Sequence, residues 1–284
     1  MSKKAHTLLP LSPALVPEKT PEKAPKNPSV AQTPAQQQWW HLPNLTAQAM
    51  AVAQYAQSAP GLVVCLTPNM SQAEKMLELV EFFINSSLPV ISFPEWETLP
   101  YDQFSPHQDI ISQRLKTLYQ LPQLQRGILV LPVSTLAQTL VPASFLEQYT
   151  FLLAQDQTLD VEGLIDQLQR SGYQRVNQVV EHGEFAIRGA LIDLFPMGAN
   201  APFRLDLFDD EIESIRQFDP ETQRSTDQVT QVELLPGKEY DLTRTGLSWF
   251  RHHFFKCFGE QARGSELYRQ VKNGHTLDGL EYYL

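Results

Sequence analysis

Two arginines and one aromatic residue form the most chemically informative set in this sequence. Arg188, Arg204 and Phe208 all lie in the stretch from Tyr173 to Asp219. Guanidinium groups form paired hydrogen bonds with carboxylates, and an exposed aromatic ring supplies a desolvated anchor at a protein interface. The set therefore predicts a surface that docks another protein.

The strands that would carry this set are predicted from alternation. Three short apolar runs are separated by His-Gly and Gly-Ala-Asn turn signals, which predicts three successive antiparallel strands. In the third run, FRLDLF at 203–208, the apolar residues are expected on a core face, with Arg204 and Phe208 on the outer face beside Arg188 of the neighbouring strand. In an alternative interpretation, Phe208 belongs to a second core face and the arginines pair with local acids.

The sequence lacks a phosphate-binding loop. Such a loop needs glycines, so that backbone N–H groups can approach the phosphates, and a lysine that reaches them. The pattern G-x-x-x-x-G-K-[ST] is absent, and neither Thr67–Met70 nor His41–Ala47 contains a glycine. Gly237-Lys238 lacks the upstream glycine and the following Ser or Thr. We therefore expect no intact nucleotide site.

Candidate metal ligands and catalytic groups are sparse. His252 and His253 are adjacent in a predicted helix, so their side chains point about 100° apart, and Cys257 alone does not complete a site. The acidic run 209–211 is explained by a hairpin turn. We expect no metal site, no catalytic residue and no enzymatic activity from this stretch.

Composition indicates a globular, cytoplasmic chain with about two domains. Of its 284 residues, 42% are hydrophobic and 19% charged, and no apolar run approaches the roughly 20 residues that span a bilayer. Cys65 and Cys257 are interpreted as reduced core residues. Prolines interrupt the basic start, so it does not resemble a secretory signal.

The net charge is unevenly distributed. Residues 1–38 contain five Lys and two Glu and carry +3, which leaves −13 for the rest of a chain whose net charge is −10. These 38 residues also hold seven of the 21 prolines, which predicts a disordered tail. An acidic body repels phosphate backbones, so extensive non-specific binding of nucleic acid is not expected.

The first globular part predicts alternating helices and strands. A first helix is expected at 46–57, and a second begins at a capping box at Ser71. A third is expected at 108–121, and a short fourth begins at Ser134. Apolar runs predict buried strands, the first at 61–66, then 89–93 and 127–131. This alternation is typical of an α/β layer with a parallel sheet.

After about Tyr149 the pattern changes to that of an α+β module. Asp160 is expected to cap a helix that ends at Gly172, and a further strand is expected at 228–234. Helices are then predicted at 245–258 and 266–272, and the sequence ends at Leu284 as a truncated chain would. In the segment from Trp96 to Leu115, an ordered loop is expected to pack Trp96, Tyr101 and Phe104 against the sheet.

Three runs carry a resemblance to a known family. WETLPYDQFSPHQDIISQRL, EHGEFAIRGALIDLFPM and RLDLFDDEIESIR closely resemble the amino-terminal region of the bacterial transcription-repair coupling factors (Mfd), itself similar to the excision-repair protein UvrB. The resemblance covers the chain from about Trp39 onward. It implies a helicase-like parallel-sheet domain (39–149, with a return at 237–284) interrupted by an inserted α+β UvrA-binding domain (150–236), preceded by the tail 1–38.

The resemblance also assigns residues. It places the UvrA-binding arginines and phenylalanine of the family on Arg188, Arg204 and Phe208. It places a degenerate nucleotide site before the first helix, on Asn44, Thr46 and Ala47. The hairpin with which UvrB grips damaged DNA corresponds to 101–105, which leaves no room for one.

The resemblance implies an adaptor in transcription-coupled nucleotide excision repair that recruits UvrA to RNA polymerase stalled at DNA damage. ATP, magnesium, polymerase and DNA would be bound by other segments of the full-length family protein, an ATP-driven DNA translocase. One alternative is a UvrB-like ATPase subunit that engages damage itself. Another is a mainly autoinhibitory segment whose module is masked in the longer protein.

Overall fold

A computed structural model describes residues 39–85, 87–99, 104–241, 244–259, 264–273 and 279–282. The predicted tail 1–38, the loop residue Tyr101 and most of the segment compared with the UvrB hairpin lie outside these residues. The chain divides into two compact units: residues up to 91 together with 125–131, and residues 92–124 together with 132–284.

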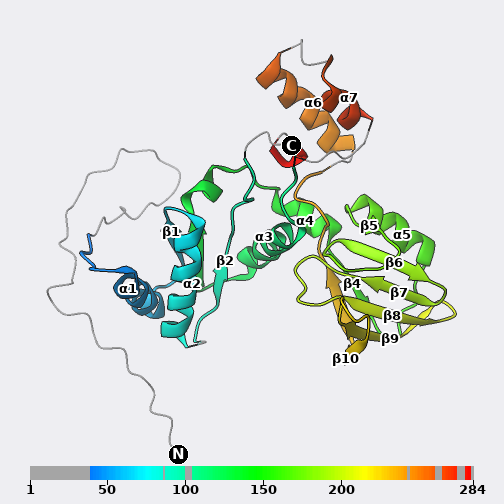
Figure 1. Ribbon diagram of the computed structural model, residues 1–284, viewed down its shortest axis with the longest axis horizontal. Helices are drawn as coiled ribbons and strands as arrows, with labels where there is room; N and C mark the ends of the chain where they lie inside the picture. Colours follow the sequence, from blue (N-terminus) through cyan, green and yellow to red (C-terminus); the bar gives the residue numbers. More distant parts are fainter. Residues whose placement is uncertain are drawn as a thin grey trace, which may run out of the picture. The chain divides into compact units, whose positions relative to one another are not determined.

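The elements follow one another in mixed α/β order (Figure 1). The α-helices are α1 (Leu45–Ser58), α2 (Met70–Ile84), α3 (Gln108–Gln120), α4 (Ala143–Tyr149), α5 (Val161–Arg170), α6 (Arg244–Phe258) and α7 (Glu266–Lys272). Short 3-10 helices are η2 (Leu121–Gln123), η3 (Val133–Ala137) and η5 (Leu280–Tyr282). The strands are β1 (Leu62–Thr67), β2 (Val90–Ser92), β3 (Gly127–Pro132), β4 (Phe151–Ala154), β5 (Gln174–Arg175), β6 (Glu184–Arg188), β7 (Leu191–Leu194), β8 (Phe203–Phe208), β9 (Glu211–Phe218), β10 (Ser225–Val229) and β11 (Gln231–Leu234).

The first unit is built on a parallel sheet with strand order β1-β3-β2, as the alternation predicted. Helices α1 and α2 bury their apolar residues in one core with the central strand β3. The predicted capping box at Ser71 is wrong. Helix α2 instead begins at Met70, because the side chain of Asn69 accepts a hydrogen bond from the backbone N–H of Gln72 and satisfies one of the free donors of the first turn.

The prediction that the first strand is fully buried is also wrong. Strand β1 lies at the edge of its sheet, and its side chains alternate. Val63 and Cys65 pack against the core, whereas Val64 and Leu66 are half exposed. A continuous apolar run therefore marked a strand but not its burial on both faces.

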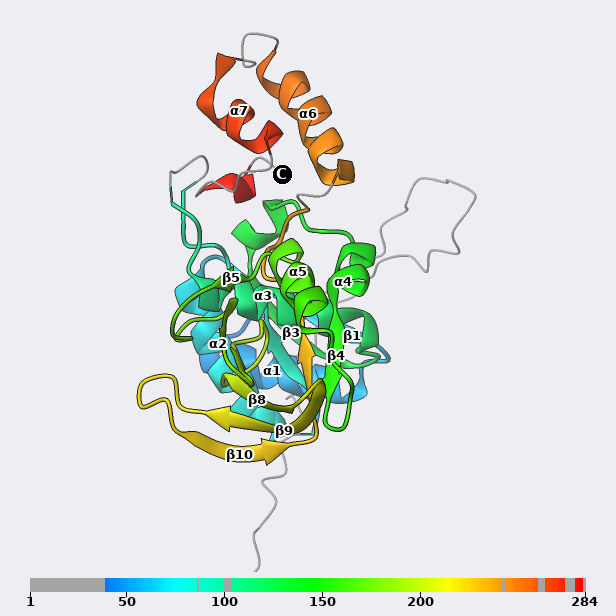
Figure 2. The ribbon, with the colours of Figure 1, turned by 90° about the vertical axis from the view of Figure 1, so that its right-hand side faces the viewer.

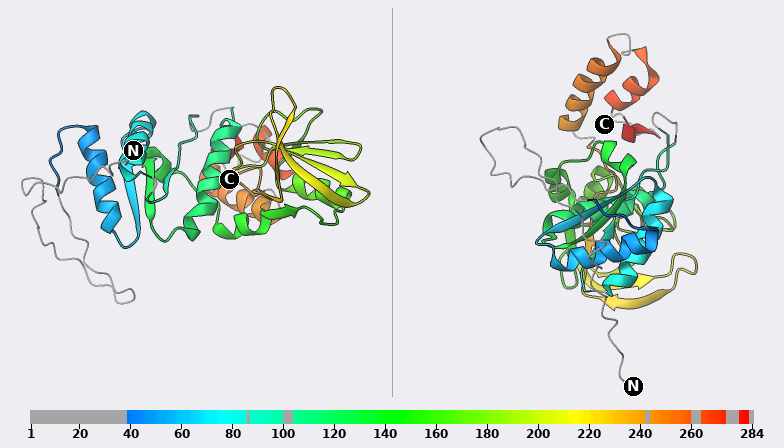
Figure 3. Two further views of the ribbon diagram at one scale, coloured as in Figure 1. Left: turned by 90° about the horizontal axis from the view of Figure 1, so that it is seen from below. Right: turned by 90° about the vertical axis from the view of Figure 1, so that its left-hand side faces the viewer.

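The second unit holds a six-stranded sheet with order β10-β9-β8-β7-β6-β5 (Figure 1). Figures 2 and 3 show its yellow and green strands from other directions. Neighbouring strands are antiparallel except β5 and β6, which are parallel. The expected set of three antiparallel strands is therefore corrected. The run 184–194 folds into two strands, because Gly189 adopts a φ of +62° and turns the chain between β6 and β7.

That extra hairpin changes the position of Arg188. Arg188 ends β6, whereas β7 is the strand that pairs with β8. Arg188 and Arg204 are thus separated by one intervening strand, and the expectation that they lie on adjacent strands is wrong. The six-residue register between β8 and β9 contains a bulge after Asp206.

One core joins the six-stranded sheet to α5 and to the antiparallel pair β4–β11. Leu164 and Leu168 of α5 pack on the sheet face that carries Leu205. Helix α5 ends as predicted, with Gly172 in the left-handed region at a φ of +96°. The sequence prediction missed β4, implied β9 only as the return strand of the hairpin that turns at 209–211, and merged β10 with β11.

The aromatic segment after β2 behaves only partly as expected. Trp96 is buried, but Phe104 is 68% exposed, so its predicted packing on the sheet is wrong. The cysteines also match their prediction only in part. Both are free thiols and Cys65 is partly buried, but Cys257 is exposed on α6, so its predicted place in a core is wrong. Among the helices in the described ranges, none has the length and apolarity needed to cross a membrane.

Candidate functional site: the outer face of the six-stranded sheet

The alternation predicted for β8 is confirmed. Phe203, Leu205 and Leu207 are buried, and Phe208 is 70% exposed. The register places Asp193 on β7, Arg204 on β8 and Arg216 on β9 opposite one another in a single row. Residues directly opposite in an antiparallel ladder share a face, so this row crosses the outer face of the sheet.

Asp193 joins the two predicted arginines. Its carboxylate is 1% exposed and accepts two parallel hydrogen bonds from Arg204, at 2.7 Å from Nε to Oδ1 and 2.9 Å from Nη2 to Oδ2. Oδ2 also accepts a hydrogen bond from Nη2 of Arg188. A single buried carboxylate thus orients both guanidinium groups, in the planar fork geometry that carboxylates and guanidiniums share.

Arg204 is held on every side by its own chain. Its guanidinium lies over the ring of Phe218, 4.9 Å from the centroid, and Nη1 donates to the carbonyl oxygen of Gln223 at 3.2 Å. The hydrogen bonds that Arg204 donates to Asp193 raise the pKa of Arg204 above its ordinary value. Only 17% of the Arg204 side chain is exposed, compared with 46% for Arg188. Arg188 is therefore the better placed of the two to contact a partner.

Phe208 projects from the end of β8. It pairs with Glu211 across the β8–β9 hairpin, whose turn includes Asp209 in the left-handed region at a φ of +53°. The acidic run 209–211 thus forms the hairpin turn, as predicted, and its last residue, Glu211, begins β9. Within the described residues, no group of three or more metal-ligating side chains is found.

The two interpretations offered by the sequence each hold in part. The arginines pair with a local acid, as the alternative interpretation held, but Phe208 does not belong to a second core face. Asp193 and Phe218 are the site residues that sequence reasoning missed. The signal for Asp193 was a single acid inside the apolar run LIDLF, where a buried carboxylate requires a charged or hydrogen-bonding partner.

At the second predicted site, the start of α1, the side chain of Asn44 bonds to one of the backbone N–H groups of the first turn. Asn44 is the N-cap of α1, and its Oδ1 accepts a hydrogen bond from the backbone N–H of Ala47 at 2.9 Å. A phosphate at a helix N-terminus needs such N–H donors. Thr46 is exposed on the first turn, and none of the hydrogen bonds within the described residues involves its side chain.

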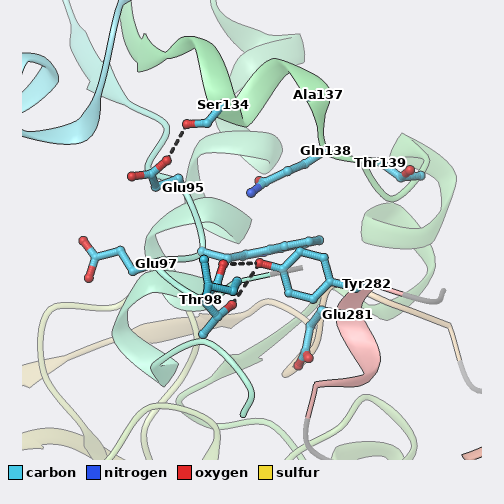
Figure 4. A pocket seen from close by; sticks show the side chains of 11 residues that line it. Glu95, Glu97, Thr98, Ser134, Ala137, Gln138, Thr139, Glu281 and Tyr282 are labelled. Atoms are coloured by element: carbon cyan, nitrogen blue, oxygen red, sulfur yellow. Dashed lines mark hydrogen bonds between the residues drawn. The ribbon is translucent and has the colours of Figure 1, made fainter. Parts of the chain in front are cut away.

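The second unit also contains a cavity of about 610 Å³, shown in Figure 4. Its polar walls are hydrogen-bonded to one another: the Ser134 hydroxyl bonds to Glu95, and the Tyr282 hydroxyl bonds to Thr98. Trp96 packs edge-on against Tyr282, with ring centroids 4.9 Å apart. Burial raises the pKa of Glu281 in the same wall. The contacts of Thr98 and Trp96 with Tyr282 hold η5 against the segment after β2.

Taken together, the outer face carries guanidinium groups fixed by Asp193 and an exposed aromatic ring. Residues 151–240, which include this sheet, match the family described as the UvrB interaction domain.

Relatives with similarity along most of the chain are transcription-repair-coupling factors. The chain is 44% identical over 238 residues to that of Haemophilus influenzae and 44% identical over 244 residues to that of Escherichia coli K12, which is 84% and 85% of this chain and 21% of each relative. Identity to the Staphylococcus aureus USA300 protein is 33% over 200 residues, 70% of this chain and 17% of the relative. The chain thus spans about a fifth of the length of these relatives, and it is a relative of their amino-terminal region.

Proposed function

We propose that this chain recruits UvrA during transcription-coupled nucleotide excision repair, and that it docks UvrA through the outer face of its six-stranded sheet. The observation that carries the proposal is Asp193, which fixes Arg188 and Arg204 on the face from which Phe208 projects. Fixed guanidiniums lose little side-chain entropy on binding, so they suit the recognition of carboxylates on a partner.

The three predicted residues have different roles in this proposal. Phe208 is the apolar anchor, and the half-exposed Arg188 contacts the partner directly. Arg204 is mainly a positioning residue, because most of its hydrogen-bonding capacity is directed to Asp193 and Gln223. Asp193 is the second positioning residue.

The wider arrangement follows the family. We propose a helicase-like domain (39–149 and 237–284) into which the UvrA-binding module (150–236) is inserted, with a degenerate nucleotide site at Asn44, Thr46 and Ala47. Capture of the Ala47 N–H by Asn44 supports the absence of phosphate binding there and argues against a UvrB-like ATPase. In a longer cytoplasmic protein, other segments would bind RNA polymerase and DNA and would use ATP and magnesium to displace the stalled polymerase.

Titration calorimetry with purified UvrA tests this proposal. We expect Arg188→Ala, Arg204→Ala and Phe208→Ala each to weaken binding by roughly tenfold to a thousandfold, as expected for loss of 1–4 kcal/mol at an interface. Arg170→Ala is the control, because Arg170 is an exposed arginine on α5, which packs on the opposite face of the sheet. Absence of UvrA binding by the unaltered chain would overturn the proposal.

A further inference from the structure

Arg216 is a third arginine on the outer face of the six-stranded sheet. It lies on β9 directly opposite Arg204, and it pairs on its other side with Gln228 of β10. Neither the sequence patterns nor the family resemblance singled it out. Its position extends the face that carries Arg188, Arg204 and Phe208 toward the edge of the sheet.

Arg216 differs from the other two arginines because it has no partner within the described part of the chain. Its side chain is exposed, and no hydrogen bond or ion pair of the described residues includes it. Arg188 and Arg204 both donate to Asp193. Asp206 also lies on this face, opposite Ser214 and two positions along the ladder from Arg216, and Glu211 is opposite Phe208 at the end of β8. None of the ion pairs among the described residues joins either acid to Arg216.

The pairing of two arginines is unfavourable for folding. Like charges directly opposite each other in an antiparallel ladder repel, and the carboxylate of Asp193 in the same row is bonded to Arg204 and Arg188 rather than to Arg216. A local arrangement that opposes stability is expected at a functional site, where a ligand supplies the compensating interaction. An anion bound beside Arg216 would offset this repulsion.

The spacing defines what such a partner must carry. Arg216 lies three strands from Arg188, or about 14 Å at roughly 4.8 Å per strand, with an offset of two residues along the sheet. The guanidinium of Arg188 is bonded to Asp193, so an acid beside Arg216 is a separate contact. The partner surface needs two separate acidic groups, one near the Arg188 end and one near β9, on either side of the row that Arg204 occupies.

We propose that Arg216 is a specificity-determining residue that binds a second carboxylate of UvrA. This inference rests on the proposed function. It adds a contact that the arginine–phenylalanine set does not contain, at the strand pair β8–β9.

The test uses the whole chain with Arg216→Ala and Arg216→Glu, and Arg170→Ala as the charge-matched control. We expect Arg216→Ala to weaken UvrA binding by about fivefold to thirtyfold and Arg216→Glu to weaken it further, since removing one partner of a charge pair affects binding on this scale. The melting temperature of Arg216→Ala should be equal to or above that of the unaltered chain, because a repulsion is removed. A merely structural arginine would lower it.

The outcomes separate this inference from the proposed function. If Phe208→Ala loses affinity while both Arg216 variants bind UvrA like the unaltered chain, the role of Arg216 is overturned and the proposed function stands. A clear fall in the melting temperature of Arg216→Ala would also overturn it. If the unaltered chain does not bind UvrA, the proposed function fails first.

Discussion

The guanidinium of Arg114 and the carboxylate of Glu239 form a fully buried, two-point ion pair, at 2.7 Å from Nε to Oε1 and 3.0 Å from Nη2 to Oε2. Arg114 comes from α3, and Glu239 follows β11, the last strand of the second unit. The same guanidinium stacks on Phe93 and Trp96, with its Cζ 4.5 Å and 4.9 Å from the ring centroids. The pair therefore connects α3 to the segment at which the matched domain ends.

Breaking this pair should destabilise the second unit strongly. Arg114→Ala leaves the carboxylate of Glu239 buried without its cation, which costs roughly 3–5 kcal/mol. Chemical denaturation followed by tryptophan fluorescence would measure the loss, with Gln113→Ala on the exposed side of α3 as the control. Replacing both partners, as in Arg114→Met with Glu239→Leu, should recover much of the stability. A single variant as stable as the unaltered chain would show that the pair contributes little.

The two faces of β8 should separate stability from binding. Leu205 is fully buried, so Leu205→Ala should cost roughly 2–5 kcal/mol of stability. Phe208→Ala should leave the melting temperature nearly unchanged while it weakens UvrA binding. Arg204→Ala is expected to lower both, since it strands the buried Asp193. Thermal melts and pulldowns would check this, and a Phe208→Ala variant that unfolds would mean that the ring is part of the core.

Local sequence patterns predicted individual helices and strands of this chain better than they predicted which strands lie side by side. The bounds of α7 and the turn of the β8–β9 hairpin could be predicted, because capping residues and turn residues act over a few positions. The hairpin at Gly189 was missed, since its flanking runs are both apolar and read as one strand. The environment of Arg188 depends on that hairpin. Alternation alone therefore could not predict that Arg188 and Arg204 both donate hydrogen bonds to the carboxylate of Asp193.

The hydroxyl of Tyr173 should contribute to the stability of the second unit, because it joins the residue before β5 to the segments that follow β7 and β11. It is buried, donates to the carbonyl oxygen of Leu235 at 2.8 Å and accepts from the N–H of Met197 at 3.1 Å; burial raises its pKa. Tyr173→Phe leaves both groups unpaired and should cost about 1–3 kcal/mol. Tyr119→Phe, which removes a more exposed hydroxyl bonded to Glu233, is the control for urea denaturation. Equal midpoints for the two variants would contradict this expectation.

The two thiols should react at different rates. Burial raises the pKa of the Cys65 thiol above its ordinary value, so less reactive thiolate is present at neutral pH. We expect maleimide to label the exposed Cys257 first, and Cys65 to gain reactivity only in alkaline solution. Mass spectrometry of the labelled chain between pH 7 and pH 10 would follow both sites. Labelling of Cys65 as fast as Cys257 at pH 7 would show that the thiol is not held in the core.

ATP with magnesium should not stabilise this chain. At the start of α1, Asn44 occupies the Ala47 N–H, and no glycine allows backbone to approach a phosphate. A ligand present at 100 times its Kd stabilises the native state by about 2.7 kcal/mol, which raises the melting temperature by several degrees. We therefore expect millimolar ATP to leave the melting temperature unchanged. Asn44→Ala should lower it, since loss of the cap costs roughly 1 kcal/mol, without creating a response to ATP. An ATP-dependent rise of several degrees in the unaltered chain would instead support the UvrB-like ATPase.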